Sequence, residues 1–153
     1  MIESDQRSRM TPPLPCLLGF FLGVACDWVW PWPVGPYPFV LPTGVFLLVL
    51  VGLSVAHLLQ TFERHGTASD PKEEATAIID TGLFRFSRNP GYLTAGALQA
   101  SLGLLLNNVW VLLTVLPALF VIDRVVVLRE EAYLEDRFGE PYLEYKAKVR
   151  RWI

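Results

Sequence analysis

The sequence predicts an all-α fold, an integral membrane bundle of four transmembrane helices with a cytoplasmic amphipathic C-terminal helix. Apolar residues make up 52% of the chain and charged residues 18%, against about 25% charged residues in a typical soluble domain. The mean hydropathy of +0.37 agrees with this. The apolar residues gather in four runs, and the basic residues flank one end of these runs. We therefore treat residues 1–153 as a single membrane domain.

The first two predicted spans cover about residues 14–30 and 39–61. Mixed charges precede the first run and no small-residue cleavage site follows it, so we expect a retained span rather than a signal peptide. Residues 28–38 between the spans are rich in Pro and Trp, which is typical of an interfacial loop. His57 lies near the far end of the second span. A single histidine without partners is better interpreted as a satisfied polar residue than as a general base.

The third and fourth predicted spans cover about residues 92–106 and 109–128. Asn107 and Asn108 separate them, and a tight turn between two apolar runs predicts a helical hairpin. The third run is short of the ~20 residues that a straight crossing needs. Pro117 lies inside the fourth run and is expected to kink it.

Residues 129–153 are predicted to form C-terminal helices. Gly139 is a natural residue to end the first of them, and Pro141 suits the first turn of the next. An apolar face then runs along this second helix through Phe138, Tyr142, Tyr145 and Val149. The pattern predicts an amphipathic helix that lies on the membrane or folds back under the bundle.

The distribution of basic residues predicts the orientation of the bundle. The Pro-rich loop and the Asn107–Asn108 turn contain no Lys or Arg, whereas both termini and the long loop 62–91 contain many. The positive-inside rule therefore places the termini and this loop in the cytoplasm, and an even number of spans agrees. We expect a multi-pass protein of a prokaryotic inner membrane.

The stretch TGLFRFSRNPGY, residues 81–92, is where glycines, a proline, two arginines and aromatic residues gather between apolar runs. Exposed backbone groups and the fixed charge of Arg88 at a membrane border suit a polar cofactor. The alternative is a plain polar connection between two spans. At the end of the fourth span, charged residues again lie at the membrane border: Asp123, Arg124, Arg129, Glu130 and Glu131.

These charged residues have two interpretations. They either form a snorkelling border of local ion pairs, or they line a polar pocket below the loop. On a regular α-helix Asp123 would share a face with Glu130, and Arg124 would share the neighbouring face with Glu131.

Several function classes are excluded by what the sequence lacks. The formal charge of −2 and the absence of a basic stripe outside the last few residues argue against a nucleic-acid partner. Cys16 and Cys26 have no His or Cys companions at metal-ligand spacing, so we expect no metal site. No Walker loop, Gly-x-Gly-x-x-Gly or Ser-His-Asp pattern occurs. Any cofactor would therefore bind to helices and loops at the membrane surface.

Read in chain order, several segments from about residue 62 onward resemble the isoprenylcysteine carboxyl methyltransferase family. They are residues 81–92, an apolar hairpin, the triplet REE at 129–131, the segment FGEPYLEY at 138–145 and VRR at 149–151. The related phospholipid N-methyltransferases look similar. The resemblance implies an integral membrane enzyme that uses S-adenosyl-L-methionine, bound in a cytoplasmic pocket between the hairpin, the preceding loop and the tail.

The resemblance also implies which residues bind this cofactor: Thr76, Ala77, Ile78, Ile79, Phe84, Asn89, Pro90, Gly91, Tyr92 and Glu130. Arg88 joins them because of its fixed charge in the same loop. The family commonly has His where this chain has Asn89, and Tyr where it has Phe84.

A further departure concerns the substrate. The eukaryotic enzymes place a substrate-binding Arg about one turn before the residue matched to Glu130, and here that position is Val126. Either Arg124 or Arg129 replaces it, or the acceptor carries no carboxylate. An amine acceptor would need a proton sink, for which Glu131 or Asp123 is the candidate.

Two other functions are kept as alternatives. A sterol-type membrane reductase has a similar C-terminal hairpin but uses NADPH and is usually longer. A non-catalytic membrane scaffold would need the loop only as a connection. The sequence leaves open the methyl acceptor, a lipophilic or lipidated molecule or a membrane lipid, and the oligomeric state.

Overall fold

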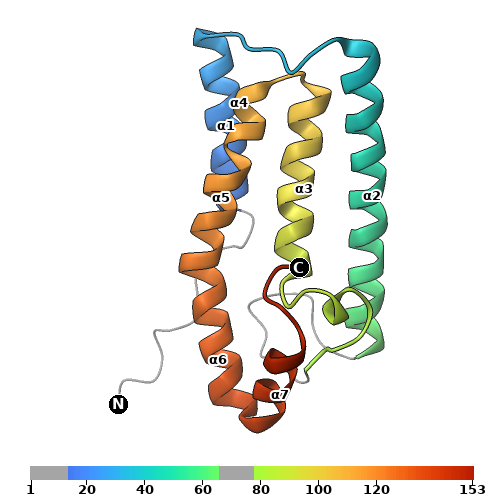
Figure 1. Ribbon diagram of the computed structural model, residues 1–153, viewed down its shortest axis with the longest axis vertical. Helices are drawn as coiled ribbons and strands as arrows, with labels where there is room; N and C mark the ends of the chain where they lie inside the picture. The colour runs from blue at the N-terminus through green and yellow to red at the C-terminus, as the bar shows by residue number, and fades with distance from the viewer. Residues whose placement is uncertain (1–13, 66–77) are drawn as a thin grey trace.

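The computed structural model describes residues 14–65 and 78–153, and within these ranges every regular element is helical, as predicted. The elements are α1 (Leu14–Val29), α2 (Tyr37–Arg64), the 3₁₀ turn η1 (Gly82–Arg85), α3 (Pro90–Leu105), α4 (Val109–Leu113), α5 (Val115–Val121), the π-helical turn η2 (Ile122–Val127), α6 (Leu128–Phe138) and α7 (Glu140–Lys148). Figure 1 shows α3 between α2 and a continuous column made of α4, α5, η2 and α6, with α1 beside this column.

Two helices are long and apolar enough to cross a membrane, by length and composition. They are α2, with 28 residues, and the column from Val109 to Phe138, with 30 residues. α1 is apolar but has 16 residues, and α3 also has 16. Two helices of the structure could thus serve as spans, and the count of four stays a prediction.

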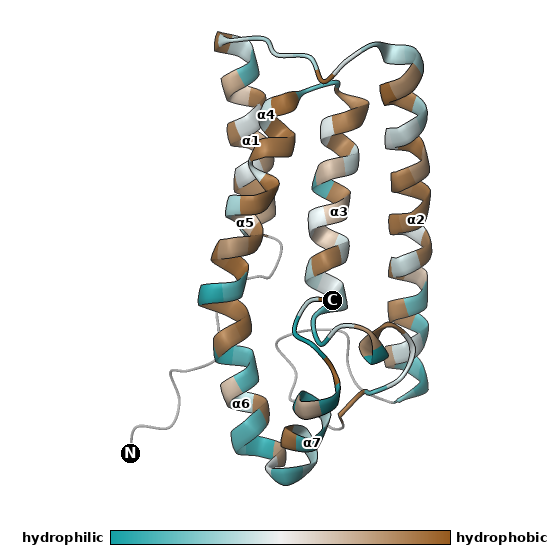
Figure 2. Ribbon diagram, viewed as in Figure 1, coloured by the Kyte–Doolittle hydropathy of each residue, from teal (hydrophilic) through white to brown (hydrophobic). Residues whose placement is uncertain are grey.

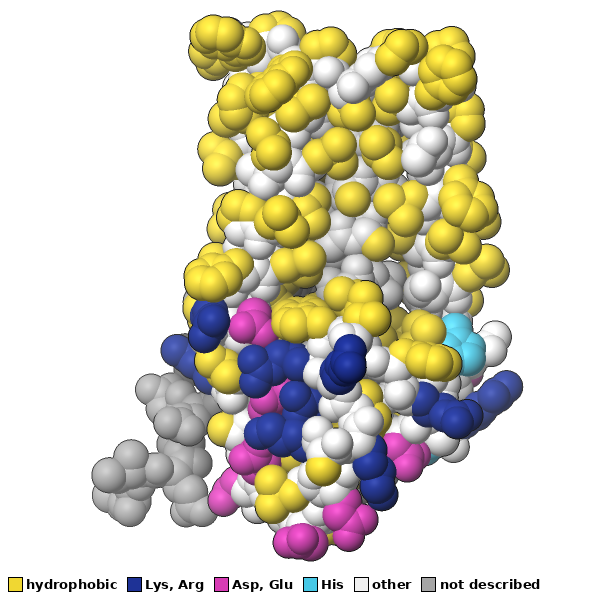
Figure 3. Space-filling model, in the orientation of Figure 1, with side chains coloured by type: hydrophobic (Ala, Val, Ile, Leu, Met, Phe, Trp, Pro, Cys, Tyr) yellow, Lys and Arg dark blue, Asp and Glu magenta, His cyan; other side chains and the backbone are white. Residues whose placement is uncertain are grey.

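Hydrophobic residues predominate along the helices of the bundle (Figure 2). On the face seen in Figure 3 apolar side chains cover most of the bundle, and charged side chains gather at the end that contains α6 and α7. Phe21, Phe46 and Leu116 illustrate the apolar surface, with 63%, 64% and 74% of their area exposed. Contiguous apolar surface of this extent is typical of contact with lipid.

Helix α3 is the centre of the bundle, since it contacts α1, α2, α4 and α5. The buried side chain of Gln99 donates a hydrogen bond of 3.0 Å to Oγ1 of Thr114, at the junction of α4 and α5. On the other side of the column α1 lies very close to α4. A Cβ on Gly23 would come within 2.6 Å of the Val111 backbone, so this contact requires glycine.

The predicted turn at Asn107 and Asn108 is confirmed, and each asparagine has a separate role. Asn107 has a φ of 50°, and its Oδ1 accepts hydrogen bonds from the amides of Val34 (2.9 Å) and Gly35 (3.1 Å). Asn108 caps α4 by accepting a 3.0 Å hydrogen bond from the amide of Val111. The turn therefore also holds the Pro-rich loop in place.

The column after this turn is not a regular α-helix. It is interrupted at Thr114, between α4 and α5, as expected because Pro117 cannot donate to the carbonyl one turn earlier. The π-helical turn η2 then alters the register of the following charged residues. The expected pairing of faces was wrong, because Asp123 and Glu131 both reach the side chain of Arg151.

The amphipathic C-terminal helix is confirmed as α7. Gly139, with a φ of 59°, ends α6, and a proline follows in the first turn of α7. Tyr142, Tyr145 and Val149 are buried together and pack against Ile78, Leu134 and Phe138. Of the two placements expected for this helix, the structure has the second, with α7 folded back beneath the bundle (Figure 1).

Candidate functional site

The end of the chain lies alongside the loop that precedes α3. The amide of Arg88 donates to the carbonyl of Arg150 at 3.0 Å. The carbonyl of Arg151 accepts two further hydrogen bonds, from Oγ of Ser87 at 3.1 Å and from Nδ2 of Asn89 at 3.2 Å. We call residues 150–153 the C-terminal segment. Its backbone fixes the position of the loop.

The side chains on either side of this contact form an ion-pair cluster centred on Glu131, which is 4% exposed. Nε and Nη2 of Arg151 bind the two carboxylate oxygens at 3.0 and 2.8 Å. Nη2 of Arg88 lies 3.3 Å from the same carboxylate, and Nζ of Lys146 lies 3.9 Å from it. We call Arg88, Asp123, Glu131, Lys146 and Arg151 the charge cluster. Ionic groups this deeply buried are tolerated when they are paired and hydrogen-bonded.

Asp123 and Trp152 attach the C-terminal segment to the bundle. Oδ1 of Asp123 accepts a 3.0 Å hydrogen bond from Nε1 of Trp152 and lies 3.4 Å from Nη1 of Arg151. The ring of Trp152 packs against an apolar cluster made of Cys16, Ala118, Ile122, Val126 and Val127. Helix α1, the helical column and the end of the chain therefore meet at one point.

A second contact joins the loop side to α6. The hydroxyl of Tyr92, in the first turn of α3, donates a 2.8 Å hydrogen bond to Oε2 of Glu130. Within the described ranges Glu130 has no cationic partner, in contrast to Glu131 beside it. Tyr92 and Glu130, two of the residues expected to bind the cofactor, are thus in direct contact although they are distant in the sequence.

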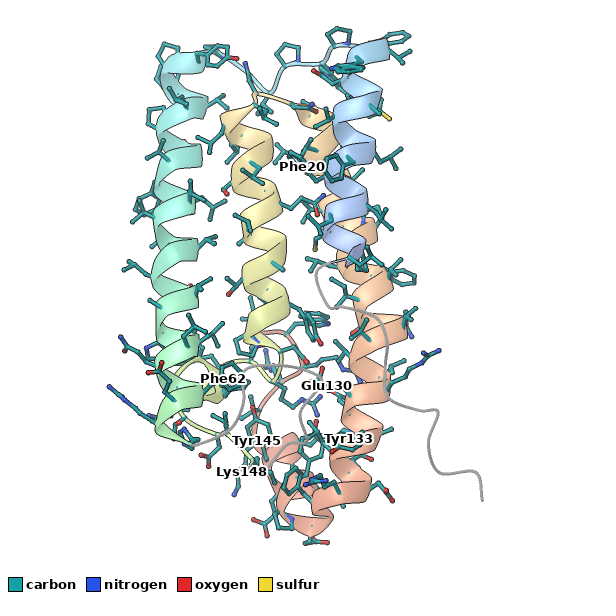
Figure 4. The ribbon with its side chains drawn as sticks, turned by 180° about the vertical axis from the view of Figure 1, so that it is seen from behind. Phe20, Phe62, Glu130, Tyr133, Tyr145 and Lys148 are labelled. Atoms are coloured by element: carbon teal, nitrogen blue, oxygen red, sulfur yellow. The ribbon has the colours of Figure 1, made fainter. Side chains whose placement is uncertain are left out.

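The 3₁₀ turn brings Phe84 to the tail. The hydroxyl of Tyr145 donates a 2.8 Å hydrogen bond to the carbonyl of Phe84. The Phe84 ring meets the ring of Phe62 edge to face, with 5.8 Å between centroids. Burial raises the pKa of Tyr145 above its ordinary value, so the hydroxyl remains a proton donor. Figure 4 shows Phe62, Glu130 and Tyr145 at the same end of the bundle.

An apolar groove of about 310 Å³ lies between α2 and α3. Its walls include Val55 and Leu58 on one helix and Ala95 and Leu98 on the other. The groove reaches Phe62 and Gly91 at the end nearest the charge cluster. It therefore connects an apolar helix surface with the loop that contains Tyr92.

The structure places the residues expected to bind the cofactor in different surroundings. Thr76 and Ala77 lie outside the described residues. Ile78 packs against the buried face of α7, and Ile79 is itself buried. Asn89 and Pro90 are buried and Gly91 is exposed.

The residues expected to act on the acceptor are also separated. Glu131 lies at the centre of the charge cluster. The Arg124 side chain is 62% exposed, contacts Asp123 and lies 5.4 Å from the centre of the Phe120 ring. Arg129 is exposed. Val126 is 4% exposed in the apolar cluster under Trp152, so the position of the family's substrate-binding Arg faces the core here.

Sequence reasoning missed the part played by Arg151, Trp152 and Lys146. The available signal was a run of basic residues and a tryptophan after a helix with a regular apolar face. That pattern indicates that the end of the chain carries charges that need partners. The partners lie in η2 and α6, and they can be identified only when the tail is folded back.

Comparison with known proteins adds a family match. A family model for phospholipid methyltransferases matches residues 40–141, which run from the first turn of α2 to the first turn of α7 and include Tyr92 and Glu130. A protein of Haemophilus influenzae, described as an uncharacterized protein, is 40% identical over 62 residues, which are 40% of this chain and 98% of that protein. No solved structure matches the chain.

Proposed function

The chain belongs to the phospholipid methyltransferase family, and on that premise we propose that it transfers a methyl group from S-adenosylmethionine to a lipophilic acceptor, in the manner of the isoprenylcysteine carboxyl methyltransferases. The family implies a membrane protein with methyltransferase activity. The cofactor, the acceptor, the four spans and the cytoplasmic side of the site belong to the proposal. The alternative within the family is a phospholipid-type N-methyltransferase.

The contact between Tyr92 and Glu130 is the observation that carries this proposal. Both residues correspond to expected cofactor contacts, and they come from different helices. The same loop is bonded to the C-terminal segment through Ser87 and Asn89. A connection without a function would not require the loop to be fixed on two sides by polar contacts.

The residues present suit the charges of S-adenosylmethionine, which carries a carboxylate, an ammonium group and a sulfonium. Glu130, without a cationic partner in the described part of the chain, can accept from an ammonium group or a ribose hydroxyl. Arg88 has two buried nitrogens, Nε and Nη1, without a partner there and can donate to the carboxylate. The bound cofactor would supply an activated methyl group.

The groove between α2 and α3 supports an apolar acceptor. Its lining of Val, Leu and Ala side chains suits an acyl or isoprenoid chain. Because it ends at Gly91, next to Tyr92 in the chain, a molecule held there would present its polar end to the loop. Phe62 lines the groove and also contacts Phe84, so it links the apolar site to the expected cofactor residues.

The protein would contribute to methyl transfer by orienting the two reactants and by excluding water from them. Methyl transfer from a sulfonium disperses positive charge, and alignment of a desolvated nucleophile provides much of the available acceleration. The oxygens of Glu131 are held by Arg88 and Arg151, which suits a positioning role. The exposed Arg124 and Arg129 remain candidates for an anionic group on the acceptor. An amine that accepts the methyl group would release a proton. Glu130 is then a third candidate, beside Glu131 and Asp123, to take up that proton.

Two measurements on the purified chain in lipid nanodiscs test the proposal. In the first, S-adenosylhomocysteine is titrated by calorimetry into wild type, Glu130→Gln and the control Glu144→Gln, whose carboxylate lies on the exposed face of α7. We expect binding by wild type and the control and at least about tenfold weaker binding by Glu130→Gln. In the second, nanodiscs that contain the chain are incubated with labelled methyl donor, and the lipids extracted from them are analysed for label. No binding by wild type, together with no labelled lipid, would reject the proposal.

A further inference from the structure

Arg88 is the buried cation whose hydrogen bonds are incomplete. Its side chain is 9% exposed, and Nη2 lies 3.3 Å from the Glu131 carboxylate. The other two nitrogens, Nε and Nη1, are buried and have no hydrogen-bond partner among the residues described. Buried N–H groups of a guanidinium are costly to leave unpaired, and such cases indicate a missing partner.

The neighbouring carboxylates do not reach these two nitrogens and are bound by other groups. Both oxygens of Glu131 are bound by Arg151. One oxygen of Asp123 is taken by Trp152 and Arg151, and the other lies 3.5 Å from Arg124. The third nearby acid, Glu135, is bonded to Lys146.

The aromatic residues of α7 do not neutralise Arg88 either. The positive charge of Arg88 lowers the pKa of Tyr142 and Tyr145, but the larger effect of burial raises both above their ordinary value. The two hydroxyls therefore stay neutral. The hydroxyl of Tyr145 donates to Phe84. Arg88 is thus paired with Glu131 through Nη2, while its Nε and Nη1 have no acceptor among the described residues.

We propose that the free N–H groups of Arg88 bind an oxyanion, carboxylate or phosphate, of a ligand bound at the loop that contains Arg88. Arginine is the residue best suited to this, because its donors are fixed in a plane and always charged. The inference rests on the proposed function, which offers two sources: the carboxylate of the methyl donor and the phosphate of a phospholipid acceptor. Glu131 then acts as the counter-ion that orients the guanidinium.

Calorimetric titration of the full chain in nanodiscs separates the sources. The ligands are S-adenosylmethionine and decarboxylated S-adenosylmethionine, which differ by the carboxylate alone. The variants are Arg88→Gln and Arg88→Lys, with Arg85→Gln in the exposed part of η1 as a matched control. If the donor carboxylate is the partner, Arg88→Gln lowers affinity for S-adenosylmethionine about 10- to 100-fold and leaves affinity for the decarboxylated ligand unchanged.

If the phosphate is the partner, both donors bind all variants equally. Binding of a short-chain phosphatidylethanolamine then weakens to a similar extent in Arg88→Gln, while binding of a diacylglycerol of the same chain length does not change. In either case Arg85→Gln behaves as wild type. Equal affinities of wild type and Arg88→Gln for all four ligands would overturn the inference.

Two controls keep folding apart from binding. Arg88→Lys retains a positive charge next to Glu131 but loses the planar set of donors, so it should fold as wild type and still lose affinity for the anionic ligand. Thermal unfolding of each variant without ligand identifies any that fail to fold. Failure of wild type to bind either donor would reject the proposed function itself, whereas normal binding of all four ligands by wild type and by both Arg88 variants rejects this inference alone.

Discussion

The hydroxyl of Tyr92 donates a 2.8 Å hydrogen bond to the carboxylate of Glu130, across 38 residues of sequence. Tyr92 belongs to the start of α3 and Glu130 to the first turn of α6. This contact therefore joins the loop that precedes α3 to the acidic first turn of α6. Behind it, Glu131 is held by Arg88 and Arg151. Glu130, which has no cationic partner among the described residues, is thus available to a ligand, and the buried Glu131 holds the fold.

Removing the Tyr92 hydroxyl should affect ligand binding more than stability. In Tyr92→Phe the Glu130 carboxylate loses its orienting donor, so we expect about 3- to 10-fold weaker binding of S-adenosylhomocysteine. A double-mutant cycle with Glu130→Gln should show a coupling of about 1 kcal/mol, measured by calorimetry. Tyr133→Phe on the exposed side of α6 is the control. Additive effects of the two changes would show that the pair does not act together.

Neutralising Glu131 should destabilise the whole loop–tail arrangement. Glu131→Gln leaves two guanidinium groups close together without their shared counter-ion, and we expect a loss of about 2–4 kcal/mol in the free energy of unfolding. Chemical unfolding in detergent, followed by tryptophan fluorescence, to which Trp152 beside Asp123 contributes, measures this loss. Glu144→Gln removes an exposed partner of Lys148 and should change stability by less than about 0.5 kcal/mol. Equal effects of the two variants would contradict the central role of Glu131.

Much of this architecture follows from local sequence signals. The turn at Asn107, the interruption before Pro117, the end of α6 at Gly139 and the buried face of α7 are each specified by a few neighbouring residues. Such features depend on backbone preferences and periodicity, which are visible in a linear sequence. They could therefore be predicted one by one.

The ion-pair partners of the site could not be predicted in the same way. The π-helical turn η2 has no marker in its sequence, yet it brings Asp123 and Glu131 to one guanidinium. Arg151 reaches Glu131 from 20 residues away and Asp123 from 28 residues away, after α7 has reversed the chain. Tyr92 and Glu130 could be placed together only through the family resemblance, because neither periodicity nor spacing relates two residues on different helices.

The close contact between α1 and α4 predicts opposite effects for two similar substitutions. In Gly23→Ala the new methyl group would meet the Val111 backbone at 2.6 Å, so α1 must move away from α4. We expect a loss of about 1–3 kcal/mol in unfolding free energy. Gly52→Ala in α2 is the matched control, since its methyl group meets nothing within 4 Å. That change should be neutral or stabilise by up to about 1 kcal/mol through helix propensity. Loss of stability in both variants would indicate a general effect of replacing glycine.

The burial of Tyr142 predicts that the fold of the tail weakens in alkaline solution. Burial, together with the negative charge of Glu131, raises the pKa of Tyr142 from 10.0 to about 12. Because the folded state favours the neutral phenol, its contribution to stability is complete below the pKa of the unfolded chain and is lost as the pH rises from there through the folded value. We expect a loss of about 2 kcal/mol over that interval, measured by chemical unfolding at a series of pH values. In Tyr142→Phe this part of the pH dependence should disappear, whereas Tyr133→Phe, at an exposed site on α6, should retain it. An unchanged alkaline profile in Tyr142→Phe would show that other groups govern the loss, and that the buried face of α7 tolerates a phenolate.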